Sequence, residues 1–140
     1  MKYWLVKQEP SKYSWNQFIQ EKETYWDGVR NFQARNNLKA MSKGDYVYFY
    51  HSVVEKRILG IAKVEKESYP DPTSKENRWV VVDLKAIKPL VKPVTLDEIK
   101  NHPKLNDIAL IKQSRLSVMP LSMAECKTIL KIGKTKLANH

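Results

Sequence analysis

The pattern of hydrophobic and polar positions predicts short strands that alternate with turns and short helices. Runs of aromatic and β-branched residues bounded by polar, Gly or Pro positions are typical of strands. Gly60, inside one of these runs, is compatible with a bulge or a close approach. The runs that we predict as strands are 3–6, 46–50, 58–64, 79–84 and 114–119.

Three short helices are predicted by capping-box patterns, in which a Ser or Thr and a Glu or Gln three residues later satisfy free backbone N–H groups. The patterns begin at Ser14, Thr95 and Ser122, and a further helical stretch is predicted around 37–41. Strands and helices are mixed rather than strictly alternating, which favours the α+β class. Five or six short strands at this spacing indicate a partly closed barrel.

The chain length of 140 residues predicts one domain over 1–140 with a substantial core. Its 25 Lys and Arg against 15 Asp and Glu give a net charge of +10. The excess is spread along the chain, with 12 basic and 8 acidic residues in 1–70 and 13 and 7 in 71–140. This distribution favours a basic face and a polyanionic partner, although it also suits a protein that is merely soluble.

Several classes of protein are disfavoured by composition. Cys126 is the only cysteine and the three histidines are far apart, so we expect no disulfide, no zinc site and no cofactor. No segment approaches the ~20 apolar residues of a membrane span, and the apolar run after Met1 is too short for a secretory signal. We therefore expect a monomer without membrane contact, in the cytoplasm or, in a eukaryote, the nucleus.

Residues 26–37 combine the side chains that a nucleobase pocket needs. Trp26 offers a stacking face, and Gly28 lets the backbone approach a planar ligand. Asn31 and Gln33 carry amides that pair with base edges, while Arg30 and Arg35 can hold phosphate. The alternative is a structured loop whose Trp belongs to the core and whose amides cap a helix.

Two other aromatic-polar clusters, 48–52 and 69–71, are predicted at a strand end and in a Pro-bounded loop. Aromatic residues among excess cations are typical of single-strand or flipped-base binding. For Trp4 and Trp79, inside predicted strands, core packing is the stronger interpretation. His51 lacks a nucleophile or an ordered carboxylate in the sequence pattern, so we predict no catalytic residue.

An enzymatic alternative comes from Asp71, Asp83 and Lys85, which have the Pro-Asp…Asp-x-Lys form of a Mg²⁺-dependent nuclease. In such enzymes the carboxylates hold the metal and the lysine steadies the water or the phosphate. A short pattern of this kind arises easily by chance in a chain rich in charge. A pocket for a free nucleoside or another small planar molecule is a second alternative.

Seven ordered blocks carry a resemblance to the EVE-domain family of the PUA-like superfamily, over residues 3 to about 130. The blocks are YWLVKQEPSKYSW (3–15), WDGVRNFQARNNLKAM (26–41), GDYVYFYHS (44–52), YPDPT (69–73), WVVVD (79–83), PVTLDEIK (93–100) and QSRLSVMP (113–120). The chain departs from the family at Gln8, where the family commonly has Ser, which brings a bulkier side chain with both a donor and an acceptor.

The resemblance implies a PUA-like mixed β pseudo-barrel surrounded by short helices, related to the YTH readers of methylated RNA. It also implies that the chain binds nucleic acid carrying a modified base, such as a methylated base in DNA or RNA, without converting it. The implied base pocket consists of Trp26, Asp27, Gly28, Val29, Arg30, Asn31, Gln33, Tyr50, His51, Ser52, Tyr69, Pro70 and Asp71, with Glu9, Pro10 and Ser117 at its walls. The residues that we expect to contact backbone phosphates are Lys7, Arg30, Arg35 and Arg115.

Overall fold

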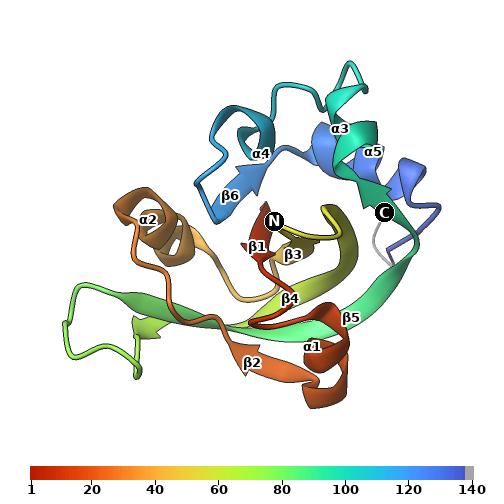
Figure 1. Cartoon of the computed structure of the whole chain (residues 1–140). Helices are drawn as coiled ribbons and strands as arrows, with labels where there is room; N and C mark the ends of the chain where they lie inside the picture. The colour runs from red at the N-terminus through yellow and green to blue at the C-terminus, as the bar shows by residue number, and fades with distance from the viewer. Residues whose placement is uncertain (138–140) are drawn as a thin grey trace.

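A computed structural model of the chain describes residues 1–137, in which six strands form one strongly curled mixed sheet and five helices pack around it (Figure 1). The strands are β1 (Tyr3–Gln8), β2 (Glu23–Tyr25), β3 (Tyr46–His51), β4 (Arg57–Pro70), β5 (Val80–Thr95) and β6 (Val118–Leu121). The helices are α1 (Trp15–Glu21), α2 (Phe32–Ala40), α3 (Leu96–Lys100), α4 (Ala109–Lys112) and α5 (Met123–Ile132). The α+β prediction is therefore confirmed.

The sheet has the order β2-β5-β4-β3-β1-β6, so β2 and β6 are its edges and the barrel stays open. The long, bent strands β4 and β5 produce most of the curl, with α1 and β2 on one side of it and α3, α5 and β6 on the other (Figure 1). The register shifts between Ile58 and Gly60, which confirms the predicted irregularity at this glycine. A bulge bends a strand and so helps a sheet to curl.

β1 and β3 are the parallel pair of this sheet, with Lys7 opposite Tyr50 and Gln8 opposite His51. The other neighbouring strands run antiparallel. Because β1 and β3 point the same way, their carboxyl ends meet at the same edge of the sheet. Segments 7–9 and 50–52, far apart in sequence, therefore lie next to each other.

Several predicted boundaries were wrong, and the strand predicted at 79–84 continues to Thr95 in β5. The strand predicted at 114–119 begins only at Val118, because 113–117 is a turn held against β1 by backbone bonds such as Lys7 N–H to the Ser117 carbonyl, at 2.9 Å. Tyr69 and Pro70, predicted in a loop, form the end of β4, where a proline is tolerated. The short strand β2 was not predicted.

The three helix starts predicted from capping patterns agree with the observed caps, whereas the helix predicted around 37–41 begins earlier, at Phe32 after the Asn31 cap. Thr95 and Ser122 make complete capping boxes, with Glu98 and Glu125 respectively. Ser14 accepts a hydrogen bond from the Gln17 N–H and caps α1. None of the helices within residues 1–137 has the length and apolar character needed to cross a membrane.

The core is built around a cluster of aromatic rings. Phe49, fully buried in β3, contacts Trp15 and Trp26 edge-on, with ring centroids 5.5 and 5.4 Å apart. Such edge-to-face pairs add to the stability gained from burial alone. Trp4 and Trp79 are also buried, which confirms the prediction that they are core residues, and the Trp4 indole donates to Asp45 at 3.0 Å.

Gly60 is the point at which α1 rests on the sheet. A Cβ at this position would lie 2.1 Å from the Trp15 ring, a distance at which the atoms overlap. We expect Gly60→Ala to lower the free energy of unfolding by about 1–3 kcal/mol, because the ring or the strand must move. Urea denaturation measures this loss, and the exposed Lys85→Ala on β5 serves as a control that should change stability by less than about 0.5 kcal/mol. If Gly60→Ala were as stable as the wild type, the close contact between Gly60 and the Trp15 ring would be contradicted.

Candidate functional site

The carboxyl ends of β1 and β3 open into a hollow of about 500 Å³, which we call the β1–β3 hollow. A volume of this size falls within the range of roughly 300 to 1,000 Å³ that small-molecule pockets occupy. Its other walls come from the 52–56 segment, from α3 and α4, and from the turn 113–117. The lining residues are Lys7, Gln8, Glu9, Tyr50, Ser52, Val53, Lys56, Leu96, Leu110, Ser114, Arg115 and Ser117.

The polar groups of the β1–β3 hollow are held in place by hydrogen bonds and by burial. The ammonium group of Lys7 donates to the Ser114 carbonyl at 2.7 Å, and burial lowers the pKa of this lysine. The Gln8 side-chain oxygen accepts from the Glu9 N–H at 3.0 Å, and within residues 1–137 the Gln8 amide nitrogen has no hydrogen-bond partner. Tyr50 is 3% exposed, and burial raises the pKa of its hydroxyl to about 12, so the phenol stays protonated.

Cations surround the β1–β3 hollow. Lys7, Lys56 and Arg115 line it, and in residues 1–137 none of the three forms an ion pair. The acidic residue in the lining, Glu9, is neutralised by Lys12 at 2.9 Å. The local field is therefore positive and favours an anionic ligand such as a phosphodiester.

A second, smaller hollow of about 310 Å³ adjoins the first at Ser114 and Arg115. Asn31 and Gln33, at the beginning of α2, form its other side. The Asn31 oxygen accepts from the Ala34 N–H at 2.9 Å and caps α2, so its acceptor is already used for the fold. Both residues are exposed, and within residues 1–137 their amide nitrogens make no hydrogen bond.

Val53, at the rim of the β1–β3 hollow, lies in a strained turn. Its φ of 72° is in the left-handed region, which β-branched residues rarely adopt. The turn is closed by a 2.8 Å bond from the Val54 N–H to the Ser52 carbonyl, and the Val53 side chain is exposed. A tight turn of this type is rare and costs backbone strain.

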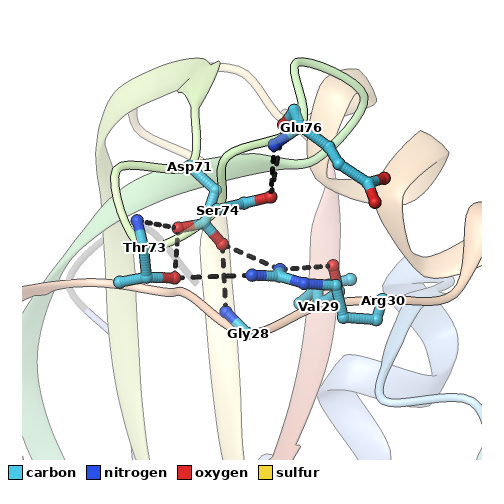
Figure 2. Close-up of polar contacts among 7 residues, drawn as sticks. All are labelled: Gly28, Val29, Arg30, Asp71, Thr73, Ser74 and Glu76. Carbon is cyan, nitrogen blue, oxygen red and sulfur yellow. Dashed lines mark hydrogen bonds and ion pairs between the residues drawn. The ribbon is translucent and has the colours of Figure 1, made fainter.

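The loop that contains Gly28 and Arg30 is held by a buried carboxylate (Figure 2). Asp71 accepts hydrogen bonds from the Gly28 N–H at 3.2 Å and from Arg30 at 2.9 Å. Its other oxygen accepts from the N–H and the hydroxyl of Thr73, at 2.7 and 2.6 Å. Burial alone would raise the pKa of Asp71, but the hydrogen bonds from Thr73, Arg30 and Gly28 outweigh it and hold the pKa below its ordinary value.

These contacts argue against the nuclease alternative. The Asp71 side chain is fully buried and its oxygens already receive four hydrogen bonds, so it is not available to bind Mg²⁺. Asp83 accepts a 2.5 Å hydrogen bond from the Tyr69 hydroxyl. The described residues contain no group of three or more His, Cys, Asp or Glu placed to hold a metal ion.

The structure separates the predicted pocket residues into two groups. The first group lines the two adjoining hollows: Lys7, Glu9, Tyr50, Ser52, Arg115, Ser117, Asn31 and Gln33. The second group lies outside their lining: Pro10, Trp26, Asp27, Gly28, Val29, Arg30, Arg35, His51, Tyr69, Pro70 and Asp71.

The largest correction concerns Trp26. This tryptophan, predicted as a stacking face, is 4% exposed and packs against Phe49 and Tyr13, so its ring presents no free face to a base. Sequence alone could not decide this, because the same indole suits a pocket and a core. Arg30, predicted to bind phosphate, is instead bound to Asp71.

Arg35 and His51 also have contacts that the sequence did not predict. Arg35 lies over the Phe32 ring and donates to the Arg78 carbonyl at 3.3 Å. His51 is buried on the other side of β3 from Tyr50, where it accepts a hydrogen bond from the Trp15 N–H. Successive side chains of a strand point to opposite faces, which explains why the side chains of the adjacent residues 50 and 51 lie in different surroundings.

Five residues of the β1–β3 hollow were missed by the sequence reasoning: Val53, Lys56, Leu96, Leu110 and Ser114. Leu96 follows a predicted cap, and Lys56 is one lysine among many. No local pattern distinguishes them, because they reach the hollow only through the curl of the sheet.

Comparisons with known proteins agree with this fold over nearly the whole chain. The family model of the EVE domain matches residues 2–132. Thymocyte nuclear protein 1 of Mus musculus is 35% identical, and the alignment covers 96% of this chain and 74% of the relative. The solved structure of Rpa0253 from Rhodopseudomonas palustris has a TM-score of 0.92 and 46% identity, covering 100% of this chain and 98% of that one.

Two further solved structures contain nucleic acid. Human THYN1 protein in complex with 5-methylcytosine containing DNA has a TM-score of 0.90 and 31% identity, covering 98% of this chain and 100% of that one. The YTH domain of Zygosaccharomyces rouxii MRB1 protein, in complex with N6-methyladenosine RNA, has a TM-score of 0.62 at 15% identity. The similarity to the YTH domain concerns only the fold.

The buried carboxylate of Asp71 generates a pH-dependent prediction. We expect Asp71→Asn to lower the free energy of unfolding at neutral pH by about 1–3 kcal/mol, because charge-assisted hydrogen bonds are lost. The lowered pKa means that the stabilisation is fully present above the ordinary pKa of 3.8 and disappears as the pH falls through the folded-state value. Urea denaturation at neutral pH and at about pH 3 should therefore show the difference between the two proteins shrinking in acid.

Asp27→Asn is the matched control, since Asp27 is exposed in the same loop. It should change stability by less than about 0.5 kcal/mol. A difference between wild type and Asp71→Asn that stays constant with pH would show that the carboxylate charge is not what holds the loop.

Proposed function

The chain belongs to the EVE domain family, and we propose that it is a monomeric, non-catalytic, single-domain module that binds nucleic acid and takes up one modified base. The base, for which 5-methylcytosine is the first candidate, enters the β1–β3 hollow. The observation that carries the proposal is the position of this hollow, in which the ends of two parallel strands supply polar groups beside cations that form no ion pair in the described part of the chain. Human THYN1 protein, a family relative by fold and sequence, has been solved with 5-methylcytosine containing DNA.

The lining of the hollow suits a planar, polar ring. The Gln8 amide and the Ser117 hydroxyl offer donors and acceptors for the edge of a base, and the buried Tyr50 offers a protonated phenol. Because Trp26 and Tyr50 are both almost fully buried, stacking in our proposal comes from the exposed Arg115 guanidinium plane. Gln8 therefore takes the place that the resemblance assigns to a serine and forms part of the edge recognition.

The cations hold the backbone that flanks the base. Lys56 and Arg115 lie at the sides of the hollow, and Lys112 lies in the adjoining one. Contacts to phosphate position a nucleic acid without reading its sequence, so selectivity must come from the hollow itself. Lys7, which is tied to the Ser114 carbonyl, shapes the turn 113–117 and adds positive charge beneath it.

The free energy that one methyl group can contribute to binding is small. Burial of one methyl is worth ~0.8 kcal/mol, which is about fourfold in affinity. Extrusion of a base from a duplex costs a few kcal/mol and stacking returns about 1–3 kcal/mol, so single-stranded or mismatched sites should bind better than intact duplex. Stronger selectivity requires hydrogen bonds to the base edge, for which Gln8 is the leading candidate.

We expect the chain to bind a 5-methylcytosine oligonucleotide about fourfold more tightly than the same oligonucleotide with cytosine, from the methyl term alone. Fluorescence anisotropy with labelled single strands and mismatched duplexes measures both affinities. Free 5-methylcytidine as a competitor separates a nucleic-acid reader from a nucleoside pocket, since a reader needs the flanking phosphates. Equal affinity for both oligonucleotides would contradict methyl recognition, and tight binding of the free nucleoside would contradict the role of the backbone.

We expect Arg115→Ala to weaken binding to methylated and unmethylated strands by a similar factor, because it removes a positive charge and a stacking plane, neither of which distinguishes the two bases. The plot of log affinity against log salt concentration should become shallower by roughly 0.7 to 0.9, the loss of about one released counterion. Arg78→Ala is the control, because Arg78 is exposed and already paired with Glu76 at 2.7 Å. An unchanged salt dependence in Arg115→Ala would remove Arg115 from the interface.

A further inference from the structure

We propose that a separate hollow on the other face of β3 binds a small monocarboxylate with an apolar body. This hollow, which we call the α1–β5 hollow, has a volume of about 430 Å³ and shares no lining residue with the β1–β3 hollow. The proposal is therefore independent of the proposed nucleic-acid function. Its lining residues are Trp15, Asn16, Ile19, His51, Glu55, Arg57, Leu59, Pro89, Leu90 and Pro93.

Three buried nitrogen atoms without a hydrogen-bond partner belong to residues of this hollow. They are Nε1 of Trp15, Nδ1 of His51 and Nε of Arg57, and no other buried side-chain nitrogen or oxygen in residues 1–137 is left unsatisfied. Buried polar groups are almost always paired, because an unpaired one loses its hydration without compensation. Three of them in one place indicate that the site is completed by a partner.

All three atoms are hydrogen-bond donors. The indole and guanidinium nitrogens donate and cannot accept. The His51 Nε2 accepts from the Trp15 backbone N–H at 3.0 Å, which leaves Nδ1 to carry the proton of the neutral ring. Burial lowers the pKa of His51, which keeps the ring neutral at pH 7. The missing partner must therefore supply acceptors.

The chain itself shows that a carboxylate suits this position. Glu55 lies 3.6 Å from Nδ1 of His51 and 3.6 Å from an η-nitrogen of Arg57, just too far for hydrogen bonds. The Glu55 side chain is 55% exposed, so it stands at the mouth of the hollow. A ligand carboxylate that displaces Glu55 outward would reach donors that Glu55 does not reach.

The other residues of the lining favour a ligand that is mostly apolar and carries a single negative charge. Ile19, Leu59 and Leu90, with two prolines, make them largely apolar. Trp15 is fixed by its contact with Gly60 and by edge-on packing against Phe18, with ring centroids 5.6 Å apart. Once Glu55 is displaced, Arg57 is the charged group left in the lining described by residues 1–137, so a single negative charge is matched, whereas a phosphate dianion would be excess.

The test is a titration of the full chain with benzoate, followed by ¹H–¹⁵N NMR. We expect the side-chain signals of Trp15 Nε1–H and Arg57 Nε–H to shift and to saturate. The Trp4 indole signal should stay in place, because that N–H is bound to Asp45. Benzamide, which has the same ring without the charge, is the matched ligand and should shift the two signals about tenfold less readily, the loss of a charge-assisted hydrogen bond.

Two variants distinguish a ligand-binding site from a site in which Glu55 itself is the partner of the three donors. Glu55→Gln removes the competing carboxylate at an exposed position and should tighten benzoate binding several-fold. Arg57→Met should weaken it by about tenfold, with the backbone NMR spectrum reporting whether the variant is folded. Equal shifts with benzamide, no saturation, or unchanged or weaker binding in Glu55→Gln would overturn the proposal, because water or Glu55 itself would then be the partner of these donors.

Discussion

The parallel pairing of β1 with β3 is the constraint on which the candidate site depends. In an otherwise antiparallel sheet, this one pair brings two carboxyl ends to the same edge, where Gln8 lies opposite His51 and Lys7 opposite Tyr50. The turn 113–117 is then hydrogen-bonded to the same strand end through Lys7. Three separate segments therefore form one concave surface, which no single stretch of sequence could provide.

Alternation along β3 gives this strand two roles. Tyr50 lines the hollow whose cations form no ion pair within residues 1–137, and His51 lines the hollow whose three buried donors have no partner in that range. Phe49, between the strand and α1, fills the aromatic core that keeps both surfaces in place. Because protein interiors are close-packed, a shift of this strand would alter both hollows together.

Much of the fold follows from local rules that the sequence displays. Caps at Ser14, Thr95 and Ser122 depend on backbone bonds within one turn, so the pattern of polar residues predicts them. The site was only half predictable. Trp26 has the composition of a pocket residue, yet it is buried by rings from distant elements. Lys56 and Leu110 gave no signal, because curvature of the sheet, not sequence spacing, places them.

The left-handed turn at Val53 places an energetic cost at the rim of the β1–β3 hollow. Glycine adopts such a backbone without strain, so the turn is a natural position at which to gain thermal tolerance. A laboratory selection for thermal stability would therefore favour Val53→Gly, which removes an exposed aliphatic side chain from the rim. The same change would widen the hollow at its rim, because Val53 is one of the residues that line it.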